Sequence, residues 1–217
     1  MNPLHREALA RMRGGIVGLL GRSRHGPEAS VAMIDQASAA LEAAELPGFA
    51  RHGSAGFAAC DMLGDIARRA RRTRRHDAAN GEALIHILAE LHQGLPWTRN
   101  PNYQDKPAMR AYLANSASCR FIGPRGLLAS EAVSLGFWMM GPGIDYPGHA
   151  HPAAETYVVL SGAAEWRIGE RPVTVERQGS VVYHAPHEVH AMSTRSDHIV
   201  ALFIWAGDLE TPPALTT

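Results

Sequence analysis

The sequence has little cysteine, no excess of charge and no long apolar run, and each shortage excludes a class of protein. Its 217 residues include only Cys60 and Cys119, too few for a disulfide framework, so both are expected to be reduced, buried side chains. Lysine plus arginine total 21 and aspartate plus glutamate total 21, which leaves no net charge to attract nucleic acid or an anionic membrane. No run reaches the roughly 18 apolar residues of a membrane span. We therefore expect a cytoplasmic protein that has neither nucleic acid nor a membrane as its partner.

The first 95 residues have the pattern of helices. Apolar residues recur at helical spacing in three segments, which are expected to form helices: Glu28–Glu45, Gly56–His76 and Asn80–Leu91. The arginine-rich run Arg68–Arg75 is interpreted as a solvated helix end, because it has no interleaved aromatic residues and the overall charge is balanced.

From residue 96 the pattern changes to that of strands. The proline-containing segment Gly94–Pro107 is expected to be a linker or long loop. After it, short runs rich in valine, isoleucine and aromatic residues alternate with turn residues, which is typical of a β-sandwich or barrel. The expected strands are Ala132–Met140, Thr156–Ser161, Ala164–Ile168, Val173–Val175, Ser180–Tyr183, Val189–Ser193 and Ile199–Trp205. The sequence thus predicts a mainly β protein, with a helical region at 1–95 and a β-barrel at 96–217.

One segment of the barrel half combines histidine, glutamate and tyrosine at two-residue spacing. His149 and His151 are two residues apart, so on an extended chain both side chains point to one face. Glu155 and Tyr157 repeat this spacing at the start of the next expected strand. Imidazole and carboxylate together suit one divalent transition metal ion, such as zinc, iron, manganese or nickel. One hairpin leaves such a site incomplete, so a further histidine is expected from elsewhere in the chain.

A second region offers three histidines for that place. His190 follows a proline corner and begins the next expected strand, so it is chosen as the third metal ligand, beside His151 and Glu155. His184 and His187 lie nearer the turn and are expected to be polar surface residues.

These two segments resemble the two sequence motifs of the cupin superfamily, whose members fold as a small jelly-roll barrel. In the first motif a glycine precedes His-x-His and a glutamate, and a second glycine follows. In the second motif a glycine, a strand and a proline precede a histidine. The matching residues are Gly148, His149, His151, Glu155 and Gly162 for the first motif, and Gly179, Pro186 and His190 for the second. The asparagine usual after the last histidine is not evident here.

Within the cupins the chain is most similar to the dimethylsulfoniopropionate (DMSP) lyases, which have tyrosines flanking the metal motif. Tyr146 and Tyr157 stand in the matching places, and the resemblance runs from about Trp97 to Trp205. It implies a metal-dependent carbon–sulfur lyase that cleaves DMSP to dimethyl sulfide and acrylate by β-elimination.

The implied roles divide the motif residues into ligands and catalytic groups. His151, Glu155 and His190 would hold the ion, and His149 would be an active-site residue beside them. A divalent ion favours the phenolate form of a nearby tyrosine, so Tyr157 or Tyr146 would act as a tyrosinate general base, with Tyr157 preferred. The ligands and the catalytic residues are thus expected to share one interior: Tyr157, Tyr146, His149, His151, Glu155 and His190.

A sulfonium substrate calls for aromatic faces, which attract a cation without hydrating it. Trp138, Tyr183 and Trp205 lie on expected strands and are candidates for substrate binding, with Trp205 near the barrel mouth; each also fits as a core aromatic residue. The expected partner is a small sulfonium carboxylate such as DMSP. The helical region is expected to cap the open end of the barrel and exclude water.

Two other functions fit the same residues. A site of two histidines and one carboxylate also suits another metal-dependent cupin enzyme, a dioxygenase or an isomerase. The other alternative is a non-catalytic cupin regulator that binds a small molecule and meets nucleic acid through its helices, and no clear helix-turn-helix is present to support it. The native ion, the identity of the base and the oligomeric state stay open at this stage.

Overall fold

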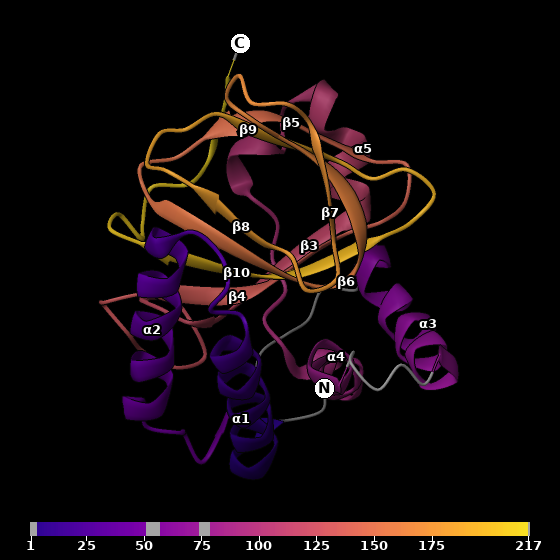
Figure 1. The fold of residues 1–217 in the computed structure, drawn as a ribbon. Helices are drawn as coiled ribbons and strands as arrows, with labels where there is room; N and C mark the ends of the chain where they lie inside the picture. Colours follow the sequence, from indigo (N-terminus) through magenta and orange to yellow (C-terminus); the bar gives the residue numbers. More distant parts are fainter. Residues whose placement is uncertain (1–3, 51–56, 74–78, 217) are drawn as a thin grey trace.

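The computed structural model describes residues 4–50, 57–73 and 79–216, with most of the helices before the strands (Figure 1). The helices of the first half are α1 (Arg6–Arg22), α2 (Glu28–Ala43), α3 (Ala58–Thr73) and α4 (Ala79–Leu91), and the short strands β1 (Leu4–His5) and β2 (Phe49–Ala50) pair with each other. The three predicted helices are confirmed as α2, α3 and α4. Both ends of the second one, Gly56 and the residues after Thr73, lie outside the described residues, as does part of the run Arg68–Arg75.

Helix α1 was not predicted as a separate element. Its buried residues recur every three or four positions, which gives the helix one apolar side: Leu9, Met12, Ile16, Leu19 and Leu20. Four glycines dilute this pattern in the sequence, and packing against α4 and α2 compensates for their low helix propensity. No helix among the described residues has the length and apolar character needed to cross a membrane.

The predicted linker contains short, ordered helical turns. Within it lies η2 (Pro101–Tyr103); η1 (His92–Gly94) overlaps its first residue and η3 (Pro107–Met109) its last, and α5 (Arg110–Asn115) follows η3. The side chain of Asn100 caps η2 by accepting a hydrogen bond from the backbone N–H of Asn102, at 3.0 Å. The linker is thereby held in one path, which carries Tyr103 into the interior of the second half.

The second half is one antiparallel sheet that curls into a half-barrel. Its strands follow the order β11-β5-β9-β6-β10-β4-β3, and β7 and β8 pair with β6. They are β3 (Ser116–Ile122), β4 (Ser134–Met140), β5 (Asp145–Ala150), β6 (Ala154–Ile168), β7 (Thr174–Arg177), β8 (Val181–His184), β9 (His190–Ser193), β10 (Ile199–Ala206) and β11 (Ala214–Leu215). The predicted strands are confirmed, except that Thr156–Ser161 and Ala164–Ile168 are parts of the single strand β6. Strands β3, β5 and β11 were not predicted as strands.

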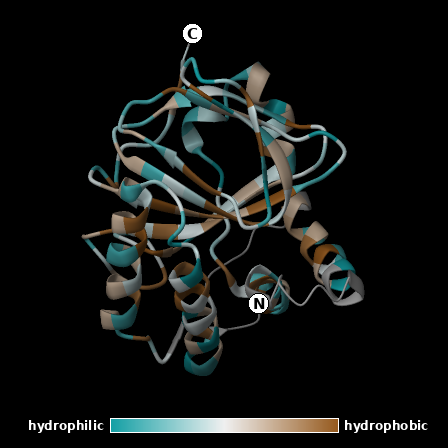
Figure 2. Cartoon of the chain, viewed as in Figure 1, coloured by the Kyte–Doolittle hydropathy of each residue, from teal (hydrophilic) through white to brown (hydrophobic). Residues whose placement is uncertain are grey.

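Each central strand contributes to two separate cores. On β10, Val200, Leu202 and Ile204 pack toward the helices, whereas Ala201, Phe203 and Trp205 point into the curled sheet. This alternation follows from the two-residue period of a strand. Burial on both faces explains why β10 is apolar throughout and why β4 is mostly apolar. The apolar strands lie next to the helices in Figure 2.

The helical region covers the outer face of the sheet, so the expectation that it caps the open end was wrong. Helices α1, α2 and α4 lie against that face in Figure 1, and α5 lies on the opposite side of the molecule. The residues that cover the interior come instead from the linker and α5, chiefly Tyr103, Met109 and Tyr112. The physical reason is that the outer face of β4 and β10 is apolar and must be buried, and the amphipathic helices bury it by packing against it.

Candidate metal centre

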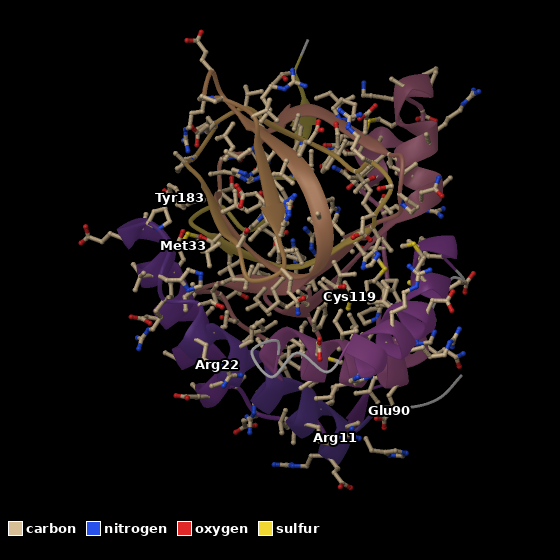
Figure 3. The ribbon with its side chains drawn as sticks, turned by 45° about the vertical axis from the view of Figure 1, so that its right-hand side comes forward. Arg11, Arg22, Met33, Glu90, Cys119 and Tyr183 are labelled. Carbon is tan, nitrogen blue, oxygen red and sulfur yellow. The ribbon has the colours of Figure 1, made fainter. Side chains whose placement is uncertain are left out.

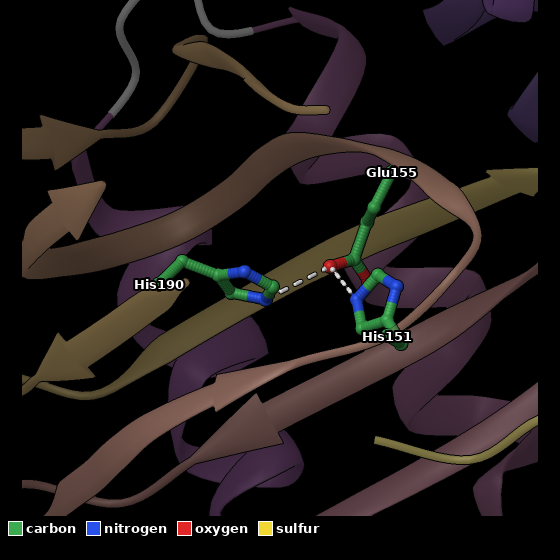
Figure 4. A group of neighbouring side chains, drawn as sticks. All are labelled: His151, Glu155 and His190. Atoms are coloured by element: carbon green, nitrogen blue, oxygen red, sulfur yellow. Dashed lines mark hydrogen bonds and ion pairs between the residues drawn. The ribbon is translucent and has the colours of Figure 1, made fainter. Parts of the chain in front are cut away.

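Three predicted ligands meet in the interior of the curled sheet (Figure 4). Glu155 lies near the start of β6, His151 in the turn just before β6, and His190 at the first position of β9. Nε2 of His151 lies 3.0 Å from Oε2 of Glu155, and Nε2 of His190 lies 3.4 Å from the same oxygen. All three residues are buried, and their ligand atoms lie within 4.8 Å of one another. The group has the composition and the closeness needed to hold one metal ion.

The main chain orients both imidazoles of this group. Nδ1 of His151 is 3.0 Å from the carbonyl of Ala153, and Nδ1 of His190 is 2.8 Å from the carbonyl of Glu188. A carbonyl can only accept, so each Nδ1 carries a proton and donates it. The second nitrogen of each ring then points at Glu155, and Nε2 of His190 is buried without a hydrogen-bond partner among the described residues. A divalent ion fits here, because it would satisfy that nitrogen, and carbonyl-anchored histidines are typical of metal ligands.

The electrostatics of the group also favour a cation. Burial by itself raises the pKa of Glu155, but His151 and the neighbouring imidazoles outweigh burial and hold that pKa well below its usual range. For His151 burial acts in the opposite direction and lowers the pKa. The Glu155 carboxylate outweighs burial, so the pKa of His151 is raised above its usual value. The carboxylate is therefore ionised at neutral pH, and the ionised form is the one that binds a metal.

His149 lies beside this group without belonging to it. Its ring stacks on Tyr146 at 3.8 Å between centroids and meets His190 edge-on at 4.1 Å. Nδ1 is 2.9 Å from the carbonyl of Pro147, and burial lowers the pKa of the ring well below 6.5. His149 is thus a neutral, oriented imidazole in contact with His190, a candidate ligand.

The two motif tyrosines both face the interior, in different surroundings. Tyr157 lies on the same face of β6 as Glu155, and burial together with that carboxylate raises its pKa well above 10. The hydroxyl of Tyr146 is 3.1 Å from that of Tyr103, and its ring stacks on Tyr112 at 4.1 Å. Tyr103 and Tyr112 were missed from the sequence, because they precede the strands and no spacing rule connects them to the motif.

The three aromatic residues predicted to bind substrate lie in three different environments. Nε1 of Trp138 donates to the hydroxyl of Tyr112 at 3.1 Å, and its ring meets Tyr157 edge-on at 5.5 Å. Nε1 of Trp205 donates to Oε1 of Glu155 at 2.6 Å, and the Trp205 ring stacks on His151 at 4.4 Å. Trp138 and Trp205 are thus brought to the candidate metal centre.

Tyr183 is not brought to the centre. It is half-buried on the helix side of β8, with the core cluster that includes Met33 (Figure 3). Val182 and His184, its neighbours on β8, are the inward residues of that strand.

The prediction that His184 is a surface residue was wrong. It is fully buried, with Nδ1 3.3 Å from Oε2 of Glu155 and Nε2 3.0 Å from the indole nitrogen of Trp166. Its ring stacks on His190 at 3.8 Å. The alternation along the strand is the signal in the sequence, because it turns residues 182 and 184 to the same face. The register of β8 on β6 then places His184 opposite Glu155. His187, in the following turn, is exposed as expected.

The comparison with family models decides the family. A model described as dimethylsulfoniopropionate lyase matches residues 33–201. The chain belongs to the DMSP lyase family. The match begins within α2 and ends within β10, so it includes most of the helical region as well as the metal motif.

Two curated relatives carry the same name. The chain is 35% identical over 114 residues to the dimethylsulfoniopropionate lyase DddQ of Ruegeria pomeroyi, covering 52% of this chain and 57% of the relative. It is 28% identical over 131 residues to the putative dimethylsulfoniopropionate lyase DddL of Cereibacter sphaeroides, covering 59% of this chain and 53% of the relative. The matched parts therefore span little more than half the length of these relatives.

Two solved structures share the fold. The crystal structure of the DMSP lyase DddQ from Ruegeria pomeroyi has a TM-score of 0.68 at 23% identity and covers 88% of this chain and 98% of its own. A second structure, from work on the DMSP lyases RdDddP and RnDddQII, has a TM-score of 0.63 at 23% identity and covers 95% of this chain and 100% of its own. The arrangement of helices and curled sheet is thus a fold of known DMSP lyases.

Proposed function

We propose that this protein is a metal-dependent lyase that cleaves DMSP into dimethyl sulfide and acrylate. The observation that carries the proposal is the buried group of His151, Glu155 and His190 with Tyr157 on the same face of β6 as Glu155. Membership in the DMSP lyase family supports the choice of substrate.

The reaction needs a base that removes a weakly acidic C–H proton. In the proposed step the phenolate oxygen of Tyr157 takes the proton from the α-carbon. The electron pair of that C–H bond then forms the double bond of acrylate, between the α- and β-carbons. The C–S bond breaks, and its electron pair leaves with sulfur as neutral dimethyl sulfide. A bound divalent ion would supply positive charge that favours the tyrosinate and receives the substrate carboxylate.

The surroundings of the two tyrosines support Tyr157 as the base. The Tyr146 hydroxyl already has a partner in Tyr103, and its ring is stacked between neighbours. Tyr157 lies two residues from Glu155 on the same strand face, so its hydroxyl shares the interior with the metal group. Tyr146 would then orient the substrate and hold His149 in place by stacking.

Aromatic rings beside the base suit a sulfonium group. Trp138 lies between Tyr157 and Tyr146, at 5.5 and 6.3 Å between ring centroids. A cation near an aromatic face gains roughly 0.5–2 kcal/mol when it has lost its hydration shell. Trp138 is therefore the proposed contact of the dimethylsulfonium group, whereas Trp205 is committed to Glu155 and His151.

The test is headspace gas chromatography of dimethyl sulfide from purified protein with millimolar DMSP and added manganese, iron(II), zinc or nickel. Equal amounts of dimethyl sulfide and acrylate that depend on the added metal are expected. His151→Ala should abolish the product, and Tyr157→Phe, which removes the base, should reduce kcat by about 10²–10⁴-fold.

Tyr183→Phe is the matched control. Tyr183 sits on the helix side of the sheet, so this variant should retain wild-type activity. If Tyr146→Phe abolished the elimination and Tyr157→Phe did not, the base would be Tyr146. If folded, metal-loaded protein released no dimethyl sulfide with any of these ions, the lyase assignment would be wrong, and oxygen uptake with candidate substrates would test the dioxygenase alternative.

A further inference from the structure

The metal group has a hydrogen-bonded neighbour that is not one of its ligands. His184 is fully buried at the end of β8, directly opposite Glu155 in the pairing of β8 with β6. Its ring is stacked on His190, with centroids 3.8 Å apart and planes inclined by 17°. A histidine this close to two ligands either binds the ion itself or acts on a ligand.

The partners of its two nitrogens decide between these roles. The indole N–H of Trp166 can only donate, and it lies 3.0 Å from Nε2 of His184. Nε2 is therefore the acceptor, and the proton of the neutral ring resides on Nδ1. Nδ1 lies 3.3 Å from Oε2 of Glu155, so His184 donates a hydrogen bond to the carboxylate. The nitrogen that faces the metal group thus has no lone pair to offer an ion.

The other oxygen of Glu155 is held by a second indole. Nε1 of Trp205 donates to Oε1 at 2.6 Å, and the Trp205 ring stacks on His151. One ring N–H thus acts on each carboxylate oxygen, from β8 and from β10. Rotation of the carboxylate about its last bond would break both contacts.

We infer that His184, fixed in its tautomer by Trp166, is a positioning residue that holds Oε2 of Glu155 toward His151 and His190. Trp205 holds the other oxygen, so that Glu155 is already oriented before an ion arrives. This inference rests on the proposed metal site and goes beyond it. It assigns the orientation of the ligand Glu155 to Trp166 and His184, two residues that are not ligands themselves. Hydrogen-bonding partners of metal ligands typically contribute 10–100-fold in metal affinity.

Two substitutions at position 184 separate hydrogen bonding from packing. His184→Phe keeps a ring to stack on His190 and removes the donor to Glu155. His184→Asn loses the ring, but its amide N–H lies where Nδ1 of the imidazole was. If the hydrogen bond to Glu155 is what matters, His184→Asn should bind metal more tightly than His184→Phe. If the packing of the ring on His190 is what matters, His184→Phe should bind metal more tightly.

The measurement is titration of the metal-free protein with cobalt(II) chloride, followed by calorimetry for the Kd and by visible absorption for the coordination of the ion. His184→Phe is expected to raise the Kd about 10–100-fold and to change the absorption spectrum. His184→Asn is expected to stay within about threefold of wild type with an unchanged spectrum. Trp166→Phe removes the donor that fixes the tautomer of His184. It should raise the Kd by a factor between those of His184→Asn and His184→Phe. It also serves as the second variant if His184→Phe does not fold.

His187→Asn is the matched control, because it makes the same exchange at an exposed histidine three residues away. An unchanged Kd in folded His184→Phe or Trp166→Phe, or equal losses in the Phe and Asn variants, would overturn the positioning role while leaving the metal site intact. If wild-type protein bound no cobalt, zinc or manganese, the proposed metal site itself would fail, and this inference with it.

Discussion

Single side chains around the metal group are held in defined protonation states by burial and by fixed partners. His149 and His184 are buried and neutral, and His151 gains a proton more readily because Glu155 lies beside it. The effects on stability have opposite signs. A buried neutral histidine opposes folding at low pH, whereas a histidine paired with a carboxylate favours it there.

Acid is expected to destabilise the metal-free protein through His184. Burial lowers its pKa from 6.5 to about 4, so below pH 6.5 the unfolded chain binds a proton that the folded chain does not. Between pH 6.5 and pH 5 this contributes a loss of roughly 2 kcal/mol. Urea unfolding of wild type and His184→Asn at both pH values measures it: the variant should lose less stability by about that amount. Parallel pH profiles for the two proteins would contradict this interpretation of the buried imidazole.

The two cysteine thiols are expected to be unreactive in the native protein. Cys60 and Cys119 are both free and buried, as predicted from the sequence. Burial raises the pKa of Cys60 to about 12 and that of Cys119 further, so almost no reactive thiolate is present at pH 8. Titration with a chromogenic disulfide reagent should detect no thiol before unfolding and two afterwards. Rapid reaction of either thiol in folded protein would show that the helix–sheet core opens readily.

At the scale of elements, the contact between α4 and β6 is close enough to require glycine. A Cβ atom at Gly81 would lie 2.8 Å from the carbonyl oxygen of Leu160, whereas one at Gly14 in α1 would meet nothing within 4 Å. Both residues lie in helices, where alanine is ordinarily the better residue by roughly 1 kcal/mol.

Gly14→Ala and Gly81→Ala are therefore expected to change stability in opposite directions. Gly14→Ala should raise the free energy of unfolding by up to about 1 kcal/mol, and Gly81→Ala should lower it by about 1–3 kcal/mol, because α4 must move away from β6. Chemical unfolding of the two variants in parallel measures both effects. Stabilisation by both substitutions would mean that α4 adjusts its position on the sheet at no cost.

At the scale of the whole molecule, the helical region and the sheet share one core. The cluster on the outer face of the sheet joins residues of α1 to α4 with residues of β3, β4, β6 and β10. The boundary predicted near residue 95 thus separates two patterns of secondary structure that bury each other's apolar surface. Removing one half would expose large apolar side chains such as Phe137, Leu202 and Ile204.

A fragment of residues 96–217 is accordingly expected to fail to fold by itself. Its outer sheet face would lose the cover of α1, α2 and α4, and the exposed strands would aggregate or stay loosely packed. Near-ultraviolet circular dichroism and thermal unfolding of the fragment, beside the full chain, measure this. A cooperative transition in the fragment would instead establish residues 96–217 as an independent domain.

The sequence alone determined what depends on local pattern. The helices α2 to α4 and the main strands follow from apolar periodicity, and His151, Glu155 and His190 follow from spacing on extended segments. The two-residue repeat of a strand reports which side chains share a face, wherever the strand is recognised.

Only the tertiary structure decided which distant groups meet. His184 reaches Glu155 because the β6–β8 register places them opposite each other, and a shift by one residue would turn Tyr183 inward instead. Tyr103 reaches Tyr146 across 43 positions, through a linker that has no period of its own. The helices cover the outer face because the apolar side chains that β3, β4, β6 and β10 place on that face must be buried. Register and burial are properties of the assembled chain, and no local spacing encodes them.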